Sequence, residues 1–81
     1  MILRKDMTDM LTDYKVKAIT YPNGMYLLGK SVPVIDEGGF YRIDGTHIFD
    51  KFKIESIDEK EEQVILTMKD RTVILGVEAK S

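Results

Sequence analysis

The chain has 81 residues, of which 43% are hydrophobic and 32% charged, and twelve Lys and Arg against fourteen Asp and Glu give a net charge of −2. This composition is typical of a small globular domain and excludes a disordered chain. Because the sequence contains no cysteine, it also excludes a disulfide framework and a thiolate metal site.

The charge balance indicates which partners to expect. Nucleic-acid binders usually carry a basic excess or a basic stripe, because their affinity comes largely from neutralised phosphates, and this sequence gives no strong signal of either kind. No run approaches the roughly 18 apolar residues of a membrane span. The start, MILRKDMTDML, has no apolar core of signal-peptide length. We therefore expect no membrane segment in this chain.

The N-terminal segment, residues 1–13, is predicted to contain a helix over about residues 2 to 12. Its apolar residues recur at helical spacing, and charged residues fill most of the other positions. A helix of about eleven residues is marginal alone, so this stripe must dock on something. The stripe consists of Leu3, Met7, Met10 and Leu11, and it continues to Tyr14.

From Tyr14 onward the hydrophobic period changes to two, which predicts a β-sheet over residues 14–79. The runs YKVKAITY and MYLLGK flank the turn Pro22-Asn23-Gly24 and form the first hairpin. Pairing Tyr21 with Met25 would place Ile19 opposite Leu27 on one face. Met25 and Tyr26 are consecutive residues of the strand after the turn. Because consecutive side chains of a strand point to opposite faces, one of the two must point outward.

The middle of the chain contains short strands separated by turn signals. Pro33 interrupts the run SVPVI and confines it to a sheet edge, a strand start or a bulge. A turn cluster at residues 36–39 precedes GFYRI, and the tight-turn dipeptide Asp44-Gly45 precedes THIF. We find no repeat or linker, so residues 1–81 are expected to form a single domain.

The last three strands are predicted to pair as two consecutive hairpins. With KDRT as the final loop, Leu66 faces Leu75, and with DEKEE as the loop before it, Phe52 faces Met68. Both choices converge on one apolar core face, which is the consistency expected of a correct register. That face also contains Ile54 and consists otherwise of Val64, Leu66, Met68, Val73, Leu75 and Val77.

The opposite face of these hairpins is predicted to carry three isoleucines, Ile57, Ile65 and Ile74. Burying each one would be worth roughly 1.5–3 kcal/mol. Either the N-terminal helix or sheet curvature covers them, or a partner does. If a protein partner or a second copy of the chain is bound, the candidate contact residues are Leu3, Met7, Met10, Leu11, Ile57, Ile65 and Ile74.

No motif in the sequence indicates catalysis, a cofactor or a metal. The single histidine, His47, has no second histidine and no Gly-framed serine beside it, so we interpret it as a turn or strand-edge residue. The acidic run 58–62 lacks the alternation and the glycine of a calcium loop, and we interpret it as a solvated hairpin tip. The protein is therefore predicted not to be an enzyme and to have no cofactor and no metal.

Aromatic and basic residues alternate around residues 40–53, which is a feature of barrels that stack nucleic-acid bases. We expect Phe40, Phe49 and Phe52 to lie in the core. The alternative is a nucleic-acid-binding barrel that uses Tyr41, Arg42, Lys51 and Lys53.

Residues 40–77 resemble the small periplasmic β-domain of inner-membrane assembly proteins in type II secretion and type IV pilus systems. The run YKVKAIT matches the first strand of that domain. The resemblance implies a non-catalytic scaffold that binds another component by strand addition or through a hydrophobic groove. The matching residues are Tyr41, Gly45, Lys53, Ile54, Ile57, Val64, Leu66 and Leu75.

The sequence as a whole predicts a mainly β fold: an SH3-like bent antiparallel sheet or barrel of five or six strands, with one N-terminal α-helix. The predicted function is a non-catalytic protein-interaction or assembly module, an adaptor that binds through the helix stripe or a sheet face. The second alternative is a small accessory subunit of a larger phage-type or enzyme complex. We expect a cytoplasmic protein, and a periplasmic one only if the chain is part of a longer secretion or pilus protein.

Overall fold

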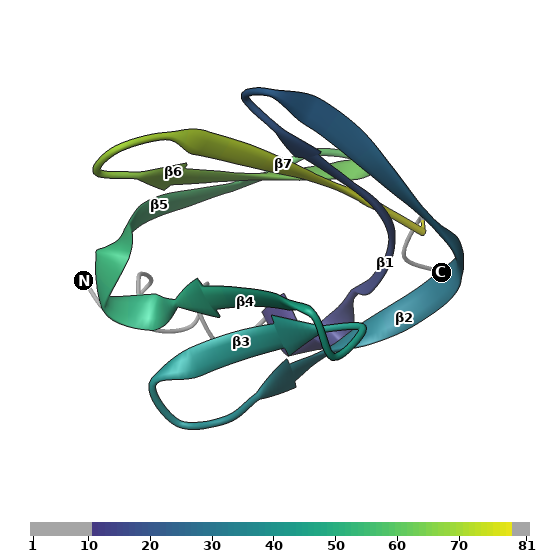
Figure 1. The fold of residues 1–81 in the computed structure, drawn as a ribbon, viewed down its shortest axis with the longest axis horizontal. Helices are drawn as coiled ribbons and strands as arrows, with labels where there is room; N and C mark the ends of the chain where they lie inside the picture. Colours follow the sequence, from purple (N-terminus) through teal and green to yellow (C-terminus); the bar gives the residue numbers. More distant parts are fainter. Residues whose placement is uncertain (1–10, 79–81) are drawn as a thin grey trace.

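The computed structural model describes residues 11–78, which form one seven-stranded antiparallel sheet curled into a half-barrel (Figure 1). Along the sheet the strands are ordered β4-β3-β2-β1-β7-β6-β5. Two short 3-10 helices, η1 (Leu11–Asp13) and η2 (Lys51–Lys53), complete the described chain. The strands are β1 (Lys15–Tyr21), β2 (Gly24–Asp36), β3 (Phe40–Ile43), β4 (His47–Asp50), β5 (Ile54–Glu59), β6 (Gln63–Met68) and β7 (Thr72–Val77).

Two predictions about the elements need correction. The sheet has seven strands rather than five or six, because the short runs around Asp44-Gly45 pair as a separate hairpin, β3 with β4. The predicted N-terminal helix lies outside the described residues except at its end, where η1 is a 3-10 turn and not an α-helix. Of the predicted helix stripe, Leu3, Met7 and Met10 therefore lie outside the described residues.

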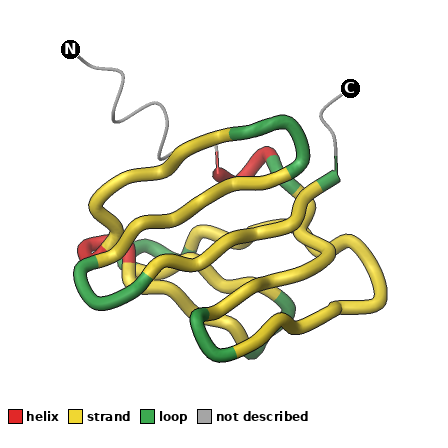
Figure 2. Tube along the Cα trace, turned by 90° about the horizontal axis from the view of Figure 1, so that it is seen from above, coloured by secondary structure: helices red, strands yellow, loops and turns green. Residues whose placement is uncertain are grey.

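Strand β2 is long because it belongs to both layers of the curled sheet (Figures 1 and 2). Its first part pairs with β1, and its last part, from Val34, pairs with β3. Pro33 forms the last pair of the β1 ladder, where β2 passes from one layer to the other, so its missing N–H is tolerated. Gly29 has a φ of 79°, which only glycine adopts readily, in the segment where the register with β1 shifts.

The larger layer contains β5, β6, β7, β1 and the first part of β2, and the smaller layer contains β4, β3 and the last part of β2 (Figure 1). The inner faces of both layers form the hydrophobic core. Their alternating buried residues match the period of two that a sheet covered on one face requires. The core consists of Leu11, Tyr14, Val16, Ile19, Val34, Tyr41, Ile43, Phe49, Ile57, Val64, Leu66, Met68, Val73, Leu75 and Val77.

The predicted core face of β6 and β7 is confirmed, since all six of its residues are buried. The register differs from the prediction by two residues: Leu66 pairs with Val73, and Val64 pairs with Leu75. A slip of two residues keeps each side chain on its face, because the side-chain period of a strand is two. The predicted core face is therefore correct although the predicted strand pairing is not.

Strand β5 departs from the predicted pattern because it contains a β-bulge. Ile54 pairs with Met68, but the register then shifts before Ser56, so Ile57 pairs with Leu66 and turns into the core. Ile57 is only 6% exposed, which corrects its predicted place beside Ile65 on the opposite face. Phe52 is 87% exposed on η2 and Phe40 is 47% exposed on β3, so the predicted core positions of both are also wrong, whereas that of Phe49 is confirmed.

The first hairpin is shifted by one residue from its predicted pairing. Pro22 and Asn23 form a two-residue loop, so that Tyr21 pairs with Gly24 and not with Met25. This shift moves Leu27 from the face of Ile19 to the opposite one, as a one-residue slip must. Leu27 is accordingly 76% exposed, whereas Ile19 is buried.

Candidate interaction surfaces

The outer face of the larger layer is apolar over the middle of four neighbouring strands, and charged side chains border this area. Lys15 and Lys17 of β1 are exposed on either side of buried Val16, and Asp58 of β5 is the cross-strand partner of Ile65. One row across the strands runs from Met25 through Thr20 and Ile74 to Ile65, as successive cross-strand partners. The row beside it contains Leu27, Ala18 and Gly76. We call this surface the neutral face; it consists of Ala18, Thr20, Met25, Leu27, Ile65, Thr67, Thr72, Ile74 and Gly76.

The smallest residues of the neutral face, Ala18 and Gly76, are cross-strand partners that lie between Leu27 on β2 and Gln63 on β6. Gly76 has no side chain, and a Cβ added there would lie 3.4 Å from the Cβ of Ala18. The adjoining Leu27 projects into solvent on β2, and Ile65 lies toward the other side on β6. Two small residues therefore lie directly beside an exposed leucine.

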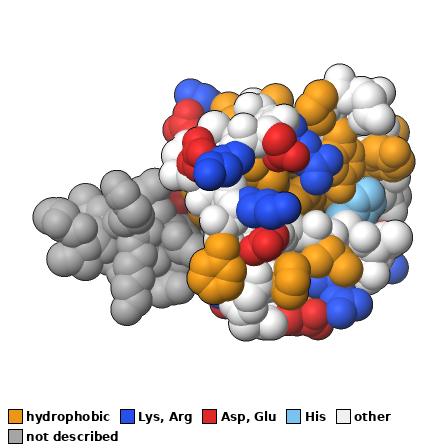
Figure 3. Space-filling view, turned by 60° about the vertical axis from the view of Figure 1, so that its left-hand side comes forward, with side chains coloured by type: hydrophobic (Ala, Val, Ile, Leu, Met, Phe, Trp, Pro, Cys, Tyr) orange, Lys and Arg blue, Asp and Glu red, His pale blue; other side chains and the backbone are white. Residues whose placement is uncertain are grey.

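The outer face of the smaller layer is different, because charged groups separate its apolar residues. Ile35 and Ile48 are both exposed, and Arg42 lies between them as the cross-strand partner of each. The Arg42 guanidinium donates to the Glu37 carboxylate at 2.7 Å. On the side of the molecule drawn in Figure 3, hydrophobic side chains are likewise interspersed with charged ones.

The four predicted nucleic-acid contacts do not form a basic, base-stacking surface. Tyr41 is only 1% exposed and lies in the core, which corrects its predicted role as a stacking platform. Arg42 is paired with Glu37, and the Lys51 ammonium lies 2.7 Å from an Asp36 carboxylate oxygen and over the Tyr41 ring. Lys53 is exposed on η2. Two of the three predicted cations therefore already contact carboxylates.

Lys51 also determines the acidity of Asp36. Its hydrogen bond, together with one from the Gly38 backbone N–H, holds the pKa of Asp36 below the usual 3.8. Because this pKa is lower in the folded state, the stabilisation by the pair is present above about pH 4. It is lost as the pH falls through the folded-state pKa of Asp36.

Replacing Lys51 with methionine should raise the pKa of Asp36 toward 3.8, because the largest cause of its depression is removed. Carboxyl-carbon NMR over a pH titration measures this directly. Lys53→Met is the matched control, since it removes a neighbouring cation of η2, and it should leave the titration of Asp36 unchanged. An Asp36 titration that is the same in Lys51→Met and the native chain would contradict the assignment.

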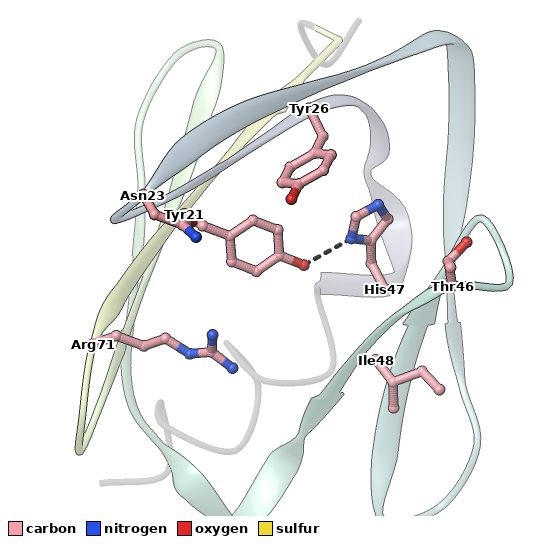
Figure 4. Close-up of a pocket in the computed structure, with 7 residues that line it drawn as sticks. All are labelled: Tyr21, Asn23, Tyr26, Thr46, His47, Ile48 and Arg71. Carbon is pink, nitrogen blue, oxygen red and sulfur yellow. Dashed lines mark hydrogen bonds between the residues drawn. The ribbon is translucent and has the colours of Figure 1, made fainter.

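A pocket of about 410 Å³ lies at one end of the half-barrel, between the β1–β2 hairpin, the start of β4 and the β6–β7 loop (Figure 4). The Tyr21 hydroxyl and Nδ1 of His47 are 2.7 Å apart and form a hydrogen bond. The Tyr26 ring meets both of these rings edge-on, at centroid distances of 5.4 Å. The pocket is lined by Tyr21, Asn23, Tyr26, Thr46, His47, Ile48 and Arg71.

Burial raises the pKa of the Tyr21 phenol, and the nearby Arg71 guanidinium opposes that rise. The phenol therefore keeps its proton at neutral pH and can donate it to Nδ1 of a neutral His47 imidazole. In that arrangement the remaining imidazole proton is on Nε2. Arg71 itself lies over the Tyr21 ring, with its guanidinium carbon 5.6 Å from the centroid.

Sequence reasoning missed this pocket and partly found the neutral face. His47 was interpreted as a turn or strand-edge residue, and it does begin β4, but its partner Tyr21 is 26 positions away and no local pattern connects them. Of the predicted partner contacts, Ile65 and Ile74 lie side by side on the neutral face. Leu11 and Ile57 are buried in the core, which corrects their predicted role as contacts.

No family model matches the sequence, and neither a curated protein nor a solved structure matches it. The resemblance of residues 40–77 to the secretion and pilus β-domain stays a prediction. Within residues 11–78, no helix is long and apolar enough to cross a membrane. In the same part of the chain, no three His, Asp or Glu side chains are grouped so as to hold a metal ion. The fold defines a small curled all-β protein, and its function must be argued from its surfaces.

Proposed function

We propose that the chain is a non-catalytic assembly module that packs its neutral face on the same face of a second copy. The observation that carries this proposal is the lack of charge on the neutral face, in a sequence of which 32% is charged. Depletion of charged residues distinguishes the centre of a protein interface from the remaining surface.

The chemistry of the neutral face limits what can cover it. A partner that placed a charged group there would bury that group without a counter-ion, which is costly. The partner surface must therefore be neutral and apolar over the same area. Met25 and Leu27 are strongly exposed in the isolated chain, so covering them would remove apolar surface from water.

A second copy meets these conditions. In a two-fold dimer each patch contacts the same patch of the partner, so the patch must complement itself. The neutral face has no charges of its own to repel a second copy, and it places the projecting Leu27 beside the small residues Ala18 and Gly76. In a face-to-face packing, Leu27 of each copy can pack over Ala18 and Gly76 of the other. Sheets commonly pack face to face in this way.

The other predicted functions have less support. A nucleic-acid-binding barrel would need new contact residues, because Tyr41 is buried and Arg42 and Lys51 are paired with carboxylates. An accessory subunit of a larger complex would use the same neutral face with a different neutral partner. The oligomeric state of the isolated chain distinguishes these possibilities.

Sedimentation equilibrium at micromolar concentration tests the proposal. The native chain should be a dimer, and Ile65→Glu should be a folded monomer, because each dimer would bury two carboxylates against apolar partners. Ile35→Glu is the matched control: it places the same charge at an exposed isoleucine on the outer face of the smaller layer, and it should remain dimeric.

A native chain that is monomeric throughout the micromolar range would overturn the self-assembly proposal. A dimer that Ile65→Glu leaves intact would place the interface elsewhere. In either case the folded state of each variant should be verified by circular dichroism, since Ile65 is only partly buried and its replacement is expected to leave the fold intact.

A further inference from the structure

The pocket around Tyr21 and His47 is separate from the neutral face, and it has the features of a binding site for an anion. Alternation along β2 places Met25 and Leu27 on the outer face and turns Tyr26 toward the pocket (Figure 4). The two surfaces thus use opposite sides of the same hairpin. A ligand can therefore occupy the pocket while a second copy of the chain covers the neutral face.

The charge in the pocket is positive and has no acidic partner among residues 11–78. Of these residues, no Asp or Glu lines the pocket, and Arg71 is the one permanently charged group that does. In the described part of the chain, ion pairs are formed by Arg42, Lys51 and Lys60, and not by Arg71. A guanidinium that is free of carboxylates presents several N–H donors in a plane, which suits a carboxylate or phosphate group.

Further donors surround the same space. The Asn23 side-chain amide lines the pocket, and Nε2 of His47 can carry a proton while Nδ1 accepts from Tyr21. The Thr46 hydroxyl also lines the pocket, but it donates to the Asp44 carbonyl oxygen at 3.0 Å. The hydrogen bond between Tyr21 and His47 fixes both rings before any ligand arrives, which reduces the ordering cost of binding.

The aromatic walls favour a ligand with a flat ring. The rings of Tyr21 and His47 are stacked with an interplanar angle of 29°, and the Tyr26 ring stands across both of them. Tyr26 is half exposed and offers ring surface to a ligand. A volume of about 410 Å³ is within the range of small-molecule sites, roughly 300–1,000 Å³.

We propose that this pocket binds a small planar anion, an aromatic or heteroaromatic ring that bears one carboxylate or phosphate. In the bound state the anionic group contacts Arg71, and the ring packs on Tyr26. The proposed event is binding alone, in which no bond is formed or broken and the hydrogen bond between Tyr21 and Nδ1 of His47 is retained.

NMR titration of the full chain tests this inference with two matched pairs of probes. Benzoate is compared with the neutral benzamide, and uridine 5′-monophosphate with uridine. His47 is the only histidine, so its ring signals report on the pocket without ambiguity. Each anion should shift these signals and bind at least about tenfold more tightly than its neutral counterpart, as a charge-assisted hydrogen bond implies.

Two variants locate the binding. Arg71→Gln should abolish the preference for the anion, whereas Lys69→Gln, which removes a cation from the same loop outside the pocket, should preserve it. Tyr26→Leu should weaken binding of both members of each pair. The inference is overturned if neither anion shifts the His47 signals at millimolar concentration, if charged and neutral probes bind equally, or if Lys69→Gln and Arg71→Gln have the same effect.

Discussion

Replacing Ile57 with serine should lower the free energy of unfolding by about 3 to 5 kcal/mol, whereas the same change at Ile65 should lower it by about 1 kcal/mol. The β5 bulge turns Ile57 into the core opposite Leu66, where serine would leave both a cavity and an unpaired hydroxyl. Ile65 lies on the neutral face, where a serine hydroxyl can reach water. Two isoleucines of similar sequence context thus differ in burial, and in the expected cost of replacing them, because β5 contains one extra residue.

Urea denaturation followed by circular dichroism measures both changes, at a protein concentration at which the chain is monomeric. The two variants are controls for each other, since they remove the same atoms from neighbouring strands. Equal destabilisation would mean that Ile57 and Ile65 share an environment, and the bulge that separates their faces would then be incorrect.

Replacing Tyr41 with alanine should also cost about 3 to 5 kcal/mol, because a large buried ring is removed. Tyr41 pairs across the β3–β4 hairpin with Phe49, which is also buried, and the Lys51 ammonium lies 5.0 Å from its ring centroid. Phe52→Ala is the matched aromatic control. Its ring is almost fully exposed, so that change should alter stability by less than about 0.5 kcal/mol.

Thermal denaturation of the two aromatic variants measures the difference. A Tyr41→Ala variant of native stability would show that Tyr41 is not a core residue. Its ring would then be available for stacking, and the nucleic-acid alternative would have to be reconsidered. If Phe52→Ala were strongly destabilising instead, the exposed position of η2 would be contradicted.

The two proposed surfaces have a common structural origin in the β1–β2 hairpin. Its two-residue loop sets the register that places Leu27 beside Ala18 and Tyr26 beside Ile19. A loop one residue longer would exchange these faces, and the neutral face and the pocket would both lose a central residue. The Pro22-Asn23 turn therefore determines both surfaces, and its Asn23 also lines the pocket.

Some of this protein was determined by its sequence alone. The all-β class and the core face of β6 and β7 follow from alternation with a period of two. That face persisted through a two-residue error in register because such a slip preserves the side-chain direction. The turn residues at Pro22-Asn23 and Asp44-Gly45 likewise marked two hairpins, since their backbone preferences are local.

Only the tertiary structure decided at which residues the inward–outward alternation of the strands changes phase. It also decided which residues, distant in sequence, contact each other across the half-barrel. The bulge in β5 and the one-residue shift of the first hairpin each moved a residue to the other face, as Ile57 and Leu27 show. The pocket joins Tyr21, His47 and Arg71 from three separate parts of the chain. A bulge or a long-range contact depends on how whole strands pack, and its energy is shared among residues that no local pattern connects.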